Sequence, residues 1–345
     1  MNKRKIISLF DGISCAQIAI NSLGIRKENY EYYSSEIDEY AKKITKCNYP
    51  ETKFIGDVCD FNHNNPEYKN PYLLIGGSPC QNLSSRGNKT GIEGKKSSLF
   101  FEYVKVLKTT NPTYFLLENV GSMSTKNRDI ITSELKKVFD GKFKCIKINS
   151  SKFVPQNRRR YYWTNIPFSE ENLPQTMDVK VQDLLEPKVD DIYYYTEHNK
   201  KRSFVVNSFN SKPEADLQIA RTIKTQAYTG RAGVDNCYHT EYKPKDKTNL
   251  RSLTPKEFER LQGIPDDYTL GISNTQRYKC VGNSFTVPVI SWFLKNIFKE
   301  VKDEVKDLNK LKVKELRKLC KSRNIRGYSR LKKAELIKLI LSKSN

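Results

Sequence analysis

Cys80 is the residue of this sequence best placed to act as a nucleophile. It follows Gly76, Gly77 and Pro79 directly after an expected strand at 72–75, so its backbone is sharply fixed where that strand ends. A cysteine beside cationic groups can ionise and attack an electrophilic carbon. A single cysteine among eight is more often a small buried residue, so this assignment depends on its neighbours.

Three further side chains could assist a reaction at Cys80. Glu118 ends an expected strand at 114–118, and a carboxyl buried there could donate a proton. Arg158 and Arg160 lie in an extended segment, where alternate residues face the same way. They would then point together, toward a phosphate or a base carbonyl.

A second group of residues indicates a site for an adenosine-containing ligand. The first expected strand ends in a turn at Gly12, where a ligand could approach backbone N–H groups. Glu36 ends the second strand and could accept hydrogen bonds from ribose hydroxyls. Asp57 could accept from an exocyclic amine. Each of these residues alone also fits an ordinary turn or strand end.

A sheet must bring these strand ends together. Strands are expected at 5–10, 32–36, 72–75, 114–118, 143–148 and 161–164. Helices are expected at 15–23, 38–47, 99–107 and 128–139. Strands that alternate with helices over residues 1–166 predict an α/β fold with a mostly parallel, Rossmann-like sheet covered on both faces. Ligands bind at the carboxyl ends of the strands in such sheets.

The remainder of the chain divides into smaller parts. Residues 167–250 show little periodicity and predict a small irregular domain, whereas residues 251–298 regain helical patterns and complete the first domain. A mixed-charge linker, 299–307, leads to a helix–loop–helix module at 308–345. The helices expected in these parts lie at 255–261, 286–298, 311–319 and 333–340.

Composition narrows the partners and the compartment. The 61 Lys and Arg against 39 Asp and Glu give a net charge of +22, which suits a polyanionic partner or, more simply, a surface of solvated lysines. No run approaches the roughly 20 apolar residues of a membrane span, and the short apolar stretch at 6–10 predicts no secretion. The eight cysteines lack CxxC spacing and only three His are present, so reduced thiols and no metal site are expected.

The motifs in their order and spacing resemble the DNA cytosine-5 methyltransferase family, in the branch of phage, bacterial and animal de novo enzymes. The resemblance covers residues 5–298. It departs from the commonest bacterial pattern at Ser14 and Cys15, where the first motif lacks its later glycines. The motifs that carry it are Phe10-Asp11-Gly12, Gly77-Ser78-Pro79-Cys80-Gln81, Glu118-Asn119-Val120, Gln156-Asn157-Arg158-Arg159-Arg160, Arg260-Leu261-Gln262-Gly263 and Gly282-Asn283-Ser284.

The resemblance implies S-adenosylmethionine-dependent methylation of cytosine carbon 5, with S-adenosylhomocysteine as product and no metal. Cys80 would add to carbon 6 of a base flipped out of the duplex. Glu118 would stabilise the protonated ring nitrogen 3, Arg160 would bind the ring carbonyl oxygen, and Arg158 would support it. The implied cofactor residues are Phe10, Asp11, Gly12, Ile13, Glu36, Ile37, Asp57, Val58, Leu99, Asn283 and Ser284.

Residues 167–250 lie where the family has its target-recognition domain. Arg231 could bind guanine bidentately or contact a phosphate. The loop at 82–98, rich in Ser, Gly, Lys and Asn, suits closure over a nucleic acid. The residues expected to contact double-stranded DNA are Gln81, Ser84, Arg86, Arg221, Thr222 and Arg231.

The C-terminal module, 308–345, is similar to the SAP and Rho N-terminal modules that bind nucleic acid. Its alternative is a basic hairpin that packs on the first domain. A cognate restriction endonuclease is a candidate partner, and the expected compartment is the cytoplasm of a bacterium or phage-infected host, or a nucleus if the host is eukaryotic.

Two other functions stay open at this point. One is a catalytically inactive DNA-binding regulator on the same scaffold, which the intact set of Cys80, Glu118 and Arg160 argues against. The other is a tRNA cytosine-5 methyltransferase, whose Cys-Phe-Thr signature this sequence lacks. The recognised DNA sequence and the oligomeric state are not predicted.

Overall fold

The computed structural model of the chain describes most of its residues. The described ranges are 3–79, 98–139, 142–175, 177–197, 215–223, 236–298, 308–322, 325, 327–329 and 331–343. None of their helices is long and apolar enough to cross a membrane.

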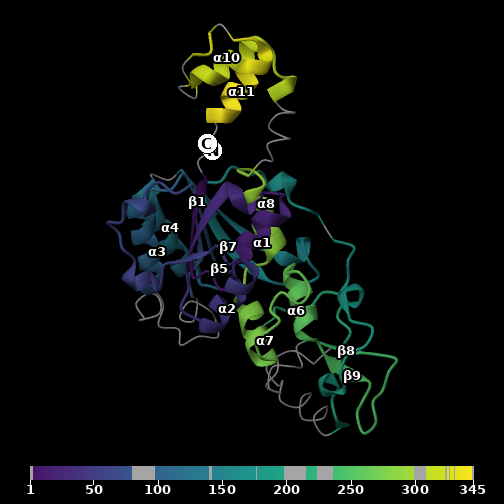
Figure 1. The fold of residues 1–345 in the computed structure, drawn as a ribbon. Helices are drawn as coiled ribbons and strands as arrows, with labels where there is room; N and C mark the ends of the chain where they lie inside the picture. Colours follow the sequence, from purple (N-terminus) through teal and green to yellow (C-terminus); the bar gives the residue numbers. More distant parts are fainter. Residues whose placement is uncertain are drawn as a thin grey trace.

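The strands of the first domain form one seven-stranded sheet in the order β3-β2-β1-β4-β5-β7-β6 (Figure 1). The strands β1 to β5 pair in parallel, and β7 is antiparallel to both β5 and β6. The reversal of order at β1 and β4 is the position where open α/β sheets bind ligands. The strands are β1 Arg4–Leu9, β2 Tyr30–Ser35, β3 Lys53–Phe54, β4 Leu73–Gly77, β5 Tyr114–Val120, β6 Lys144–Asn149 and β7 Arg159–Thr164.

Helices cover both faces of this sheet, because its strands are apolar on both sides. Neighbouring residues of β1 enter different cores: Ile6 packs with α1, α7 and α8 on one face, and Ile7 packs with α3 and α4 on the other. Figure 1 shows the two groups of helices on opposite sides of the sheet. The helices are α1 Cys15–Ser22, α2 Glu39–Asn48, α3 Ser98–Thr110, α4 Thr125–Phe139, α6 Pro255–Gln262, α7 Asn274–Asn283 and α8 Val287–Leu294.

The α/β, Rossmann-like architecture predicted from the sequence is confirmed, and its element boundaries shift by a few residues. The predictions missed β3, which is two residues long, and α7. The expected helix at 286–298 ends earlier, at Leu294. Short 3-10 turns connect the elements at Lys27–Asn29, Val58–Asp60, Pro66–Tyr68, Ser150–Lys152, Glu170–Asn172, Val181–Leu184 and Asp191–Tyr193.

The described part of residues 167–250 is irregular, apart from β8 (Cys237–His239), which pairs with β9 (Leu250–Ser252). It is tied to α6 through Glu186, whose N–H donates to Glu257 Oε1 at 2.7 Å. Glu257 also forms a buried ion pair with the guanidinium of Arg251 on β9, at 2.6 Å. Glu257 also completes the capping box of α6 with Thr254. The irregular segment and the sheet domain therefore share polar contacts at the start of α6.

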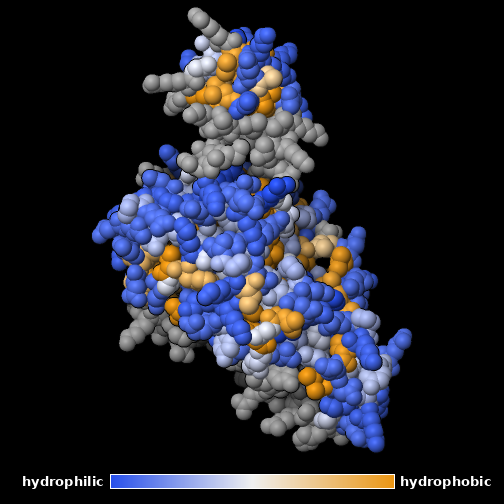
Figure 2. Space-filling view, in the orientation of Figure 1, coloured by the Kyte–Doolittle hydropathy of each residue, from blue (hydrophilic) through white to orange (hydrophobic). Residues whose placement is uncertain are grey.

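The C-terminal residues form a separate small core. The helices α10 (Val313–Ser322) and α11 (Lys333–Lys343) bury Leu316, Cys320 and Leu336 against one another. Figure 1 shows both helices apart from those of the sheet domain, and Figure 2 shows apolar residues at their surface. The expected helical hairpin is confirmed, with a thin core that leaves several of its apolar residues only partly buried.

Candidate active site

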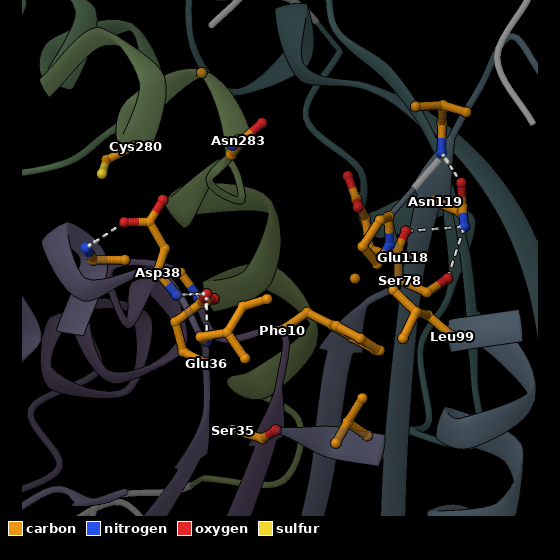
Figure 3. A pocket seen from close by; sticks show the side chains of 18 of the residues that line it. Phe10, Ser35, Glu36, Asp38, Ser78, Leu99, Glu118, Asn119, Cys280 and Asn283 are labelled. Carbon is orange, nitrogen blue, oxygen red and sulfur yellow. Dashed lines mark hydrogen bonds between the residues drawn. The ribbon is translucent and has the colours of Figure 1, made fainter. Parts of the chain in front are cut away.

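A pocket of about 490 Å³ opens at the carboxyl ends of β1, β2, β4 and β5 (Figure 3). We call the part formed after β1 and β2 the β1–β2 end, and the part formed after β4 and β5 the β4–β5 end. A volume of this size suits a drug-sized ligand. The lining residues are Phe10, Gly12, Ser35, Glu36, Ile37, Asp38, Ala41, Asp57, Val58, Gly77, Ser78, Pro79, Leu99, Glu118, Asn119, Val120, Arg158, Arg160, Cys280, Gly282 and Asn283.

The β1–β2 end is built on an unusual turn after β1. Phe10, Gly12 and Ser14 all have left-handed backbone angles, with φ of 55°, 58° and 57°. Side chains in this region cost roughly 1–2 kcal/mol per non-glycine residue, so the turn needs contacts that hold it. One of them is the Gly12 N–H, which donates to Glu36 Oε2 at 2.8 Å.

Glu36 is the acidic residue expected after the second strand, and its carboxylate is already oriented. Its other oxygen accepts from the N–H groups of Ile37 and Asp38, each at 2.8 Å. Burial raises the pKa of the Glu36 carboxyl, and the three backbone hydrogen bonds oppose that rise. A carboxylate has about four lone-pair sites, so hydrogen-bonding capacity remains for a ligand.

Apolar and polar side chains from other elements complete this end. Asp57 caps the turn Val58–Asp60 and accepts from the Cys59 N–H at 2.9 Å, while Val58 itself is buried. Across the pocket, α7 contributes Cys280 and Asn283 to the lining, and Figure 3 shows Cys280 beside Asp38. Ile37 and Leu99 also line the pocket, as the resemblance implied.

The β4–β5 end holds an ion pair. Arg160 Nε lies 2.9 Å from Glu118 Oε1, and the two side chains are only 14% and 13% exposed. β5 and β7 pair so that these two residues come from adjacent strands. Pairing across the strands neutralises both charges at a pocket wall, where an isolated charge would be costly.

Glycine and asparagine fix the segment that leads to Cys80. A Cβ added at Gly77 would lie 2.8 Å from the Phe285 ring and 3.1 Å from Glu118 Oε2, so only glycine fits there. The buried side chain of Asn119 donates to Ser78 Oγ at 3.0 Å. These contacts hold the Ser78 backbone beside the ion pair.

Arg158 has a different place from the one the sequence predicted. Its side chain is buried and donates to the carbonyls of Gly282 and Ser284, at 3.1 and 2.9 Å. The expectation that Arg158 and Arg160 point together is confirmed only in that both line the pocket. Arg158 holds the C-terminal end of α7, because two main-chain carbonyls there would otherwise lack their charged donor.

A network of buried amides supports the same junction. Gln156 donates to the Leu261 carbonyl and accepts from the Ile223 N–H. Gln262 reaches the carbonyls of Val281 and Ser284. These hydrogen bonds therefore link the sheet domain, the irregular segment and α7 behind the pocket.

Several predicted site residues lie elsewhere or outside the described residues. Asp11 and Ile13 are buried beneath the turn, and Ser284 caps α7 with its hydroxyl on the Val281 carbonyl, so none of the three is among the lining residues. Their expected role in binding a cofactor stays a prediction, and the structure places their side chains outside the pocket lining. The residues outside the described part of the chain are Cys80, Gln81, Ser84, Arg86 and Arg231.

Arg221 and Thr222 are described; Arg221 pairs with Asn236, and Thr222 contacts the segment at 155–157. Asn236 accepts from the Arg221 N–H and donates to its carbonyl, at 2.8 and 3.2 Å. Thr222 donates through its hydroxyl to the Asn157 carbonyl. Their backbone is thus held beside the arginine segment, which includes Arg158 of the pocket wall.

Four lining residues belong to neither the predicted site residues nor the motifs: Ser35, Asp38, Ala41 and Cys280. Asp38 had a signal, because an aspartate before a helical pattern is an N-cap, and it does accept from two N–H groups of α2. Cys280 had none, since it lies on α7, a helix that the sequence patterns did not predict. Burial raises the pKa of the Cys280 thiol to about 12, so it stays protonated at neutral pH.

Comparison with known proteins assigns the class and then the family. In solved structures the fold is similar to Entamoeba histolytica methyltransferase EhMeth (TM-score 0.68, 20% identity, covering 86% of this chain and 98% of that one). It is also similar to a mutant of Spodoptera frugiperda DNMT2 (TM-score 0.65, 23% identity, covering 86% and 100%). The TM-scores show the Rossmann-like methyltransferase fold, and at these sequence identities the similarity shows the fold alone.

The model of the C-5 cytosine-specific DNA methylase family matches residues 4–299, and the chain belongs to this family. It is therefore a DNA cytosine-5 methyltransferase. Among curated relatives it is 30% identical to the Type II methyltransferase M1.ScrFI of Lactococcus lactis subsp. cremoris, over 84% of this chain and 76% of the relative. It is 27% identical to the orphan methyltransferase M.SPRI of Bacillus phage SPR, over 87% and 98%.

A second family model, the Rho termination factor N-terminal domain, matches residues 307–344. The predicted Rho-N-like character of the C-terminal module is thereby confirmed. The resemblance to SAP modules is looser.

Proposed function

We propose that the chain transfers a methyl group from S-adenosylmethionine to carbon 5 of a cytosine in double-stranded DNA, with Cys80 as the nucleophile. The observation that carries this proposal is the ion pair of Glu118 and Arg160, which shares one pocket with Glu36. Ser78 and Pro79 line the same pocket, and Cys80 is the next residue in the chain.

The β1–β2 end fits S-adenosylmethionine. The carboxylates of Glu36 and Asp57 suit ribose hydroxyls and an adenine amine, and the side chains of Ile37, Val58 and Leu99 suit an apolar base. When bound, this cofactor supplies an electrophilic methyl group on a sulfonium. The residues of this end bind and orient it.

At the β4–β5 end, each residue has a separate task. The Cys80 thiolate forms a bond to carbon 6 of cytosine, and the electron pair of the ring double bond then makes carbon 5 nucleophilic. Arg160 binds the ring carbonyl oxygen as negative charge develops there. Glu118, held by Arg160, stabilises the protonated ring nitrogen 3 and accepts from the exocyclic amine.

The reaction ends when the covalent adduct between Cys80 and the base breaks down. Carbon 5 would gain the methyl group as the methyl–sulfur bond of the cofactor breaks and leaves S-adenosylhomocysteine. A base then removes the carbon 5 proton, and the electron pair re-forms the ring double bond as the bond to the Cys80 sulfur breaks. Arg158 touches none of the reacting atoms in this scheme. It acts by holding Gly282, and with it the neighbouring Asn283, at the pocket wall.

We place DNA recognition in residues 167–250, the proposed target-recognition domain. The backbone of Arg221 and Thr222 is held beside the segment that carries Arg158, so base-edge readers there would act close to the flipped cytosine. Gln81, Ser84, Arg86 and Arg231 complete the proposed DNA contacts.

Bisulfite sequencing of DNA from a host that expresses the chain tests this function. We expect protection of one short sequence motif wherever it occurs, and no protection with Cys80→Ser, because a hydroxyl is a far weaker nucleophile than a thiolate. Equal protection by the variant would refute the role of Cys80. Methylation of tRNA rather than DNA would support the tRNA alternative instead.

We propose that the module at 308–345, joined by a linker at 299–307, adds sequence-independent DNA affinity. Residues 299–345 carry 16 Lys and Arg against 6 Asp and Glu. On α10, Lys314, Lys318 and Lys321 are exposed at helical spacing. Each cation that neutralises a phosphate releases a counterion, so this affinity should fall steeply with salt.

Deleting residues 308–345 tests the role of the module. Binding to all duplexes should weaken alike and its salt dependence should flatten, while the methylated sequence stays the same. An unchanged salt slope would favour a hairpin that packs on the first domain. A changed methylation site would show that the module reads sequence.

The proposed DNA substrate also suggests where the chain acts. We place it in the bacterial or phage-infected cytoplasm, or in a nucleus if the host is eukaryotic. The Type II names of several relatives make a cognate restriction endonuclease a candidate partner.

A further inference from the structure

Asp11 belongs to the turn of the β1–β2 end, but it is not among the residues that line the pocket. Its side chain is buried, at 5% exposure, and its carboxylate accepts hydrogen bonds from three hydroxyls. Tyr32 donates to Oδ1 at 2.6 Å, and Ser34 donates to Oδ2 at 2.8 Å. Ser14 also donates to Oδ2. The carboxylate thus joins both ends of the turn to β2.

The third of these donors is unusual. Ser14 stands at the N-cap of α1, where a serine hydroxyl normally accepts from the first helical N–H groups. Here its side chain makes no capping hydrogen bond. The hydroxyl turns to Asp11 instead, and the Ser14 backbone takes the left-handed conformation. The Ser14 hydroxyl therefore stabilises the turn through Asp11 and does not cap α1.

The turn in question determines the shape of the pocket. Phe10 and Ser14 hold left-handed conformations without being glycine, which persists only where surrounding contacts enforce it. The backbone of Asp11 adds one such contact, because its N–H donates to the Ser35 carbonyl at 3.1 Å. The next residue, Gly12, donates to Glu36. The positions of Phe10, Gly12 and Glu36 in the pocket all follow from where Asp11 is held.

We propose that Asp11 is a positioning residue for the cofactor: its carboxylate fastens the turn at 10–14 to β2 and so preforms the binding surface without touching the ligand. This inference rests on the proposed function, since it takes S-adenosylmethionine as the ligand of the β1–β2 end. Tyr32 and Ser34 belong to the same device, as donors on the strand that ends beside Glu36.

A pair of tyrosine variants on one strand tests the proposal. Tyr30 and Tyr32 are both buried on β2, but the hydroxyl of Tyr30 contacts Asn21 rather than Asp11. Calorimetry with S-adenosylhomocysteine on the full chain should show Tyr32→Phe binding severalfold more weakly than wild type, because one hydrogen bond to the carboxylate is lost. Tyr30→Phe should bind like wild type.

Substitutions of Asp11 itself extend the test. Asp11→Ala should weaken binding by about tenfold or more, since it leaves three buried hydroxyls without their acceptor. Asp11→Asn, which keeps the shape and an acceptor oxygen, should recover most of that loss. At saturating cofactor, kcat for each variant that folds should stay within about threefold of wild type, because the Glu118 and Arg160 pair is untouched.

Each outcome decides the matter. Equal affinity in Tyr32→Phe and Tyr30→Phe would overturn the proposal, as would lower thermal stability of the Asp11 variants with unchanged affinity, which marks a merely structural residue. Wild-type protein that binds neither S-adenosylmethionine nor S-adenosylhomocysteine would instead contradict the proposed function itself. The tyrosine pair keeps the test available if Asp11→Ala fails to fold.

Discussion

The β1–β2 end of the pocket is shaped by residues close in the sequence, whereas the β4–β5 end depends on segments far apart. Gly12 and Glu36, which meet at the first, are separated by 24 positions. Arg158 and Ser284, which meet behind the second, are separated by 126. The turn and the carboxylate of the first end therefore lie within one βαβ unit, to which α7 adds Cys280 and Asn283 from a distant segment, whereas the second end depends on distant segments throughout.

This difference has a functional consequence. A preformed cofactor surface lowers the cost of ordering on binding. The catalytic end instead combines an ion pair with a segment that continues into Cys80, so its residues act on the substrate base. Substitutions at the two ends should separate cofactor affinity from turnover.

The largest effect is expected for Arg160→Ala. Loss of the group that stabilises charge on the ring oxygen should lower kcat by about 10²–10³-fold, while cofactor affinity stays close to wild type. A tritiated methyl-transfer assay at saturating cofactor and DNA measures this. Arg159→Ala is the matched control, because Arg159 is exposed on the same strand and is not a lining residue. Similar kcat losses in both would remove Arg160 from the reaction.

Arg158→Ala should affect both ends together, which distinguishes it from Arg160→Ala. It leaves the carbonyls of Gly282 and Ser284 buried without their charged donor, which costs about 2–4 kcal/mol of unfolding free energy. Chemical denaturation measures this loss, and cofactor affinity should fall with it because Asn283 lies between the two carbonyls. An active, fully stable variant would show that α7 is held by other contacts.

Glu36→Ala and Asp57→Ala should raise the cofactor requirement by about tenfold each, with little change in DNA binding, because each removes one polar contact. Calorimetry with S-adenosylhomocysteine on the purified variants gives the affinities. If both bind the cofactor as wild type does, the β1–β2 end is not its site.

The smallest effects are expected for two glycine substitutions, one at each end of the pocket. A Cβ at Gly12 would meet nothing within 4 Å. Gly12→Ala should therefore lower the free energy of unfolding only by the backbone strain of a positive φ, about 1–2 kcal/mol. A Cβ at Gly77 would press on Phe285 and Glu118, so Gly77→Ala should lower kcat several-fold more than it weakens cofactor binding. A larger loss of kcat in Gly12→Ala than in Gly77→Ala would contradict the division of the pocket into a cofactor end and a catalytic end.

Sequence patterns predicted the strand ends well because the signals there are local. An apolar run followed by a turn places Glu36 and Glu118 at strand ends without knowledge of the whole fold, and both line the pocket. The motif series also predicted the family correctly.

Contacts between distant segments were beyond these patterns. Alternation in an extended segment cannot show that Arg158 is drawn away to α7, nor that β7 inserts antiparallel between β5 and β6. The helix α7 itself was missed because Asn, Thr and Gly are weak helix formers and packing decides its conformation. Asp11 was expected at the cofactor from the family resemblance, yet its carboxylate is hydrogen-bonded to partners on β2.

The central claim is that Cys80 forms a covalent bond to the target cytosine in this pocket. A duplex that carries 5-fluorocytosine at the methylated position tests it, since fluorine at carbon 5 cannot be removed as the proton is and the adduct cannot break down. With S-adenosylmethionine present, we predict a protein–DNA complex that survives a denaturing gel for the wild-type chain and none for Cys80→Ala. A stable complex with Cys80→Ala, or none with a wild-type chain that methylates the normal duplex, would contradict the account.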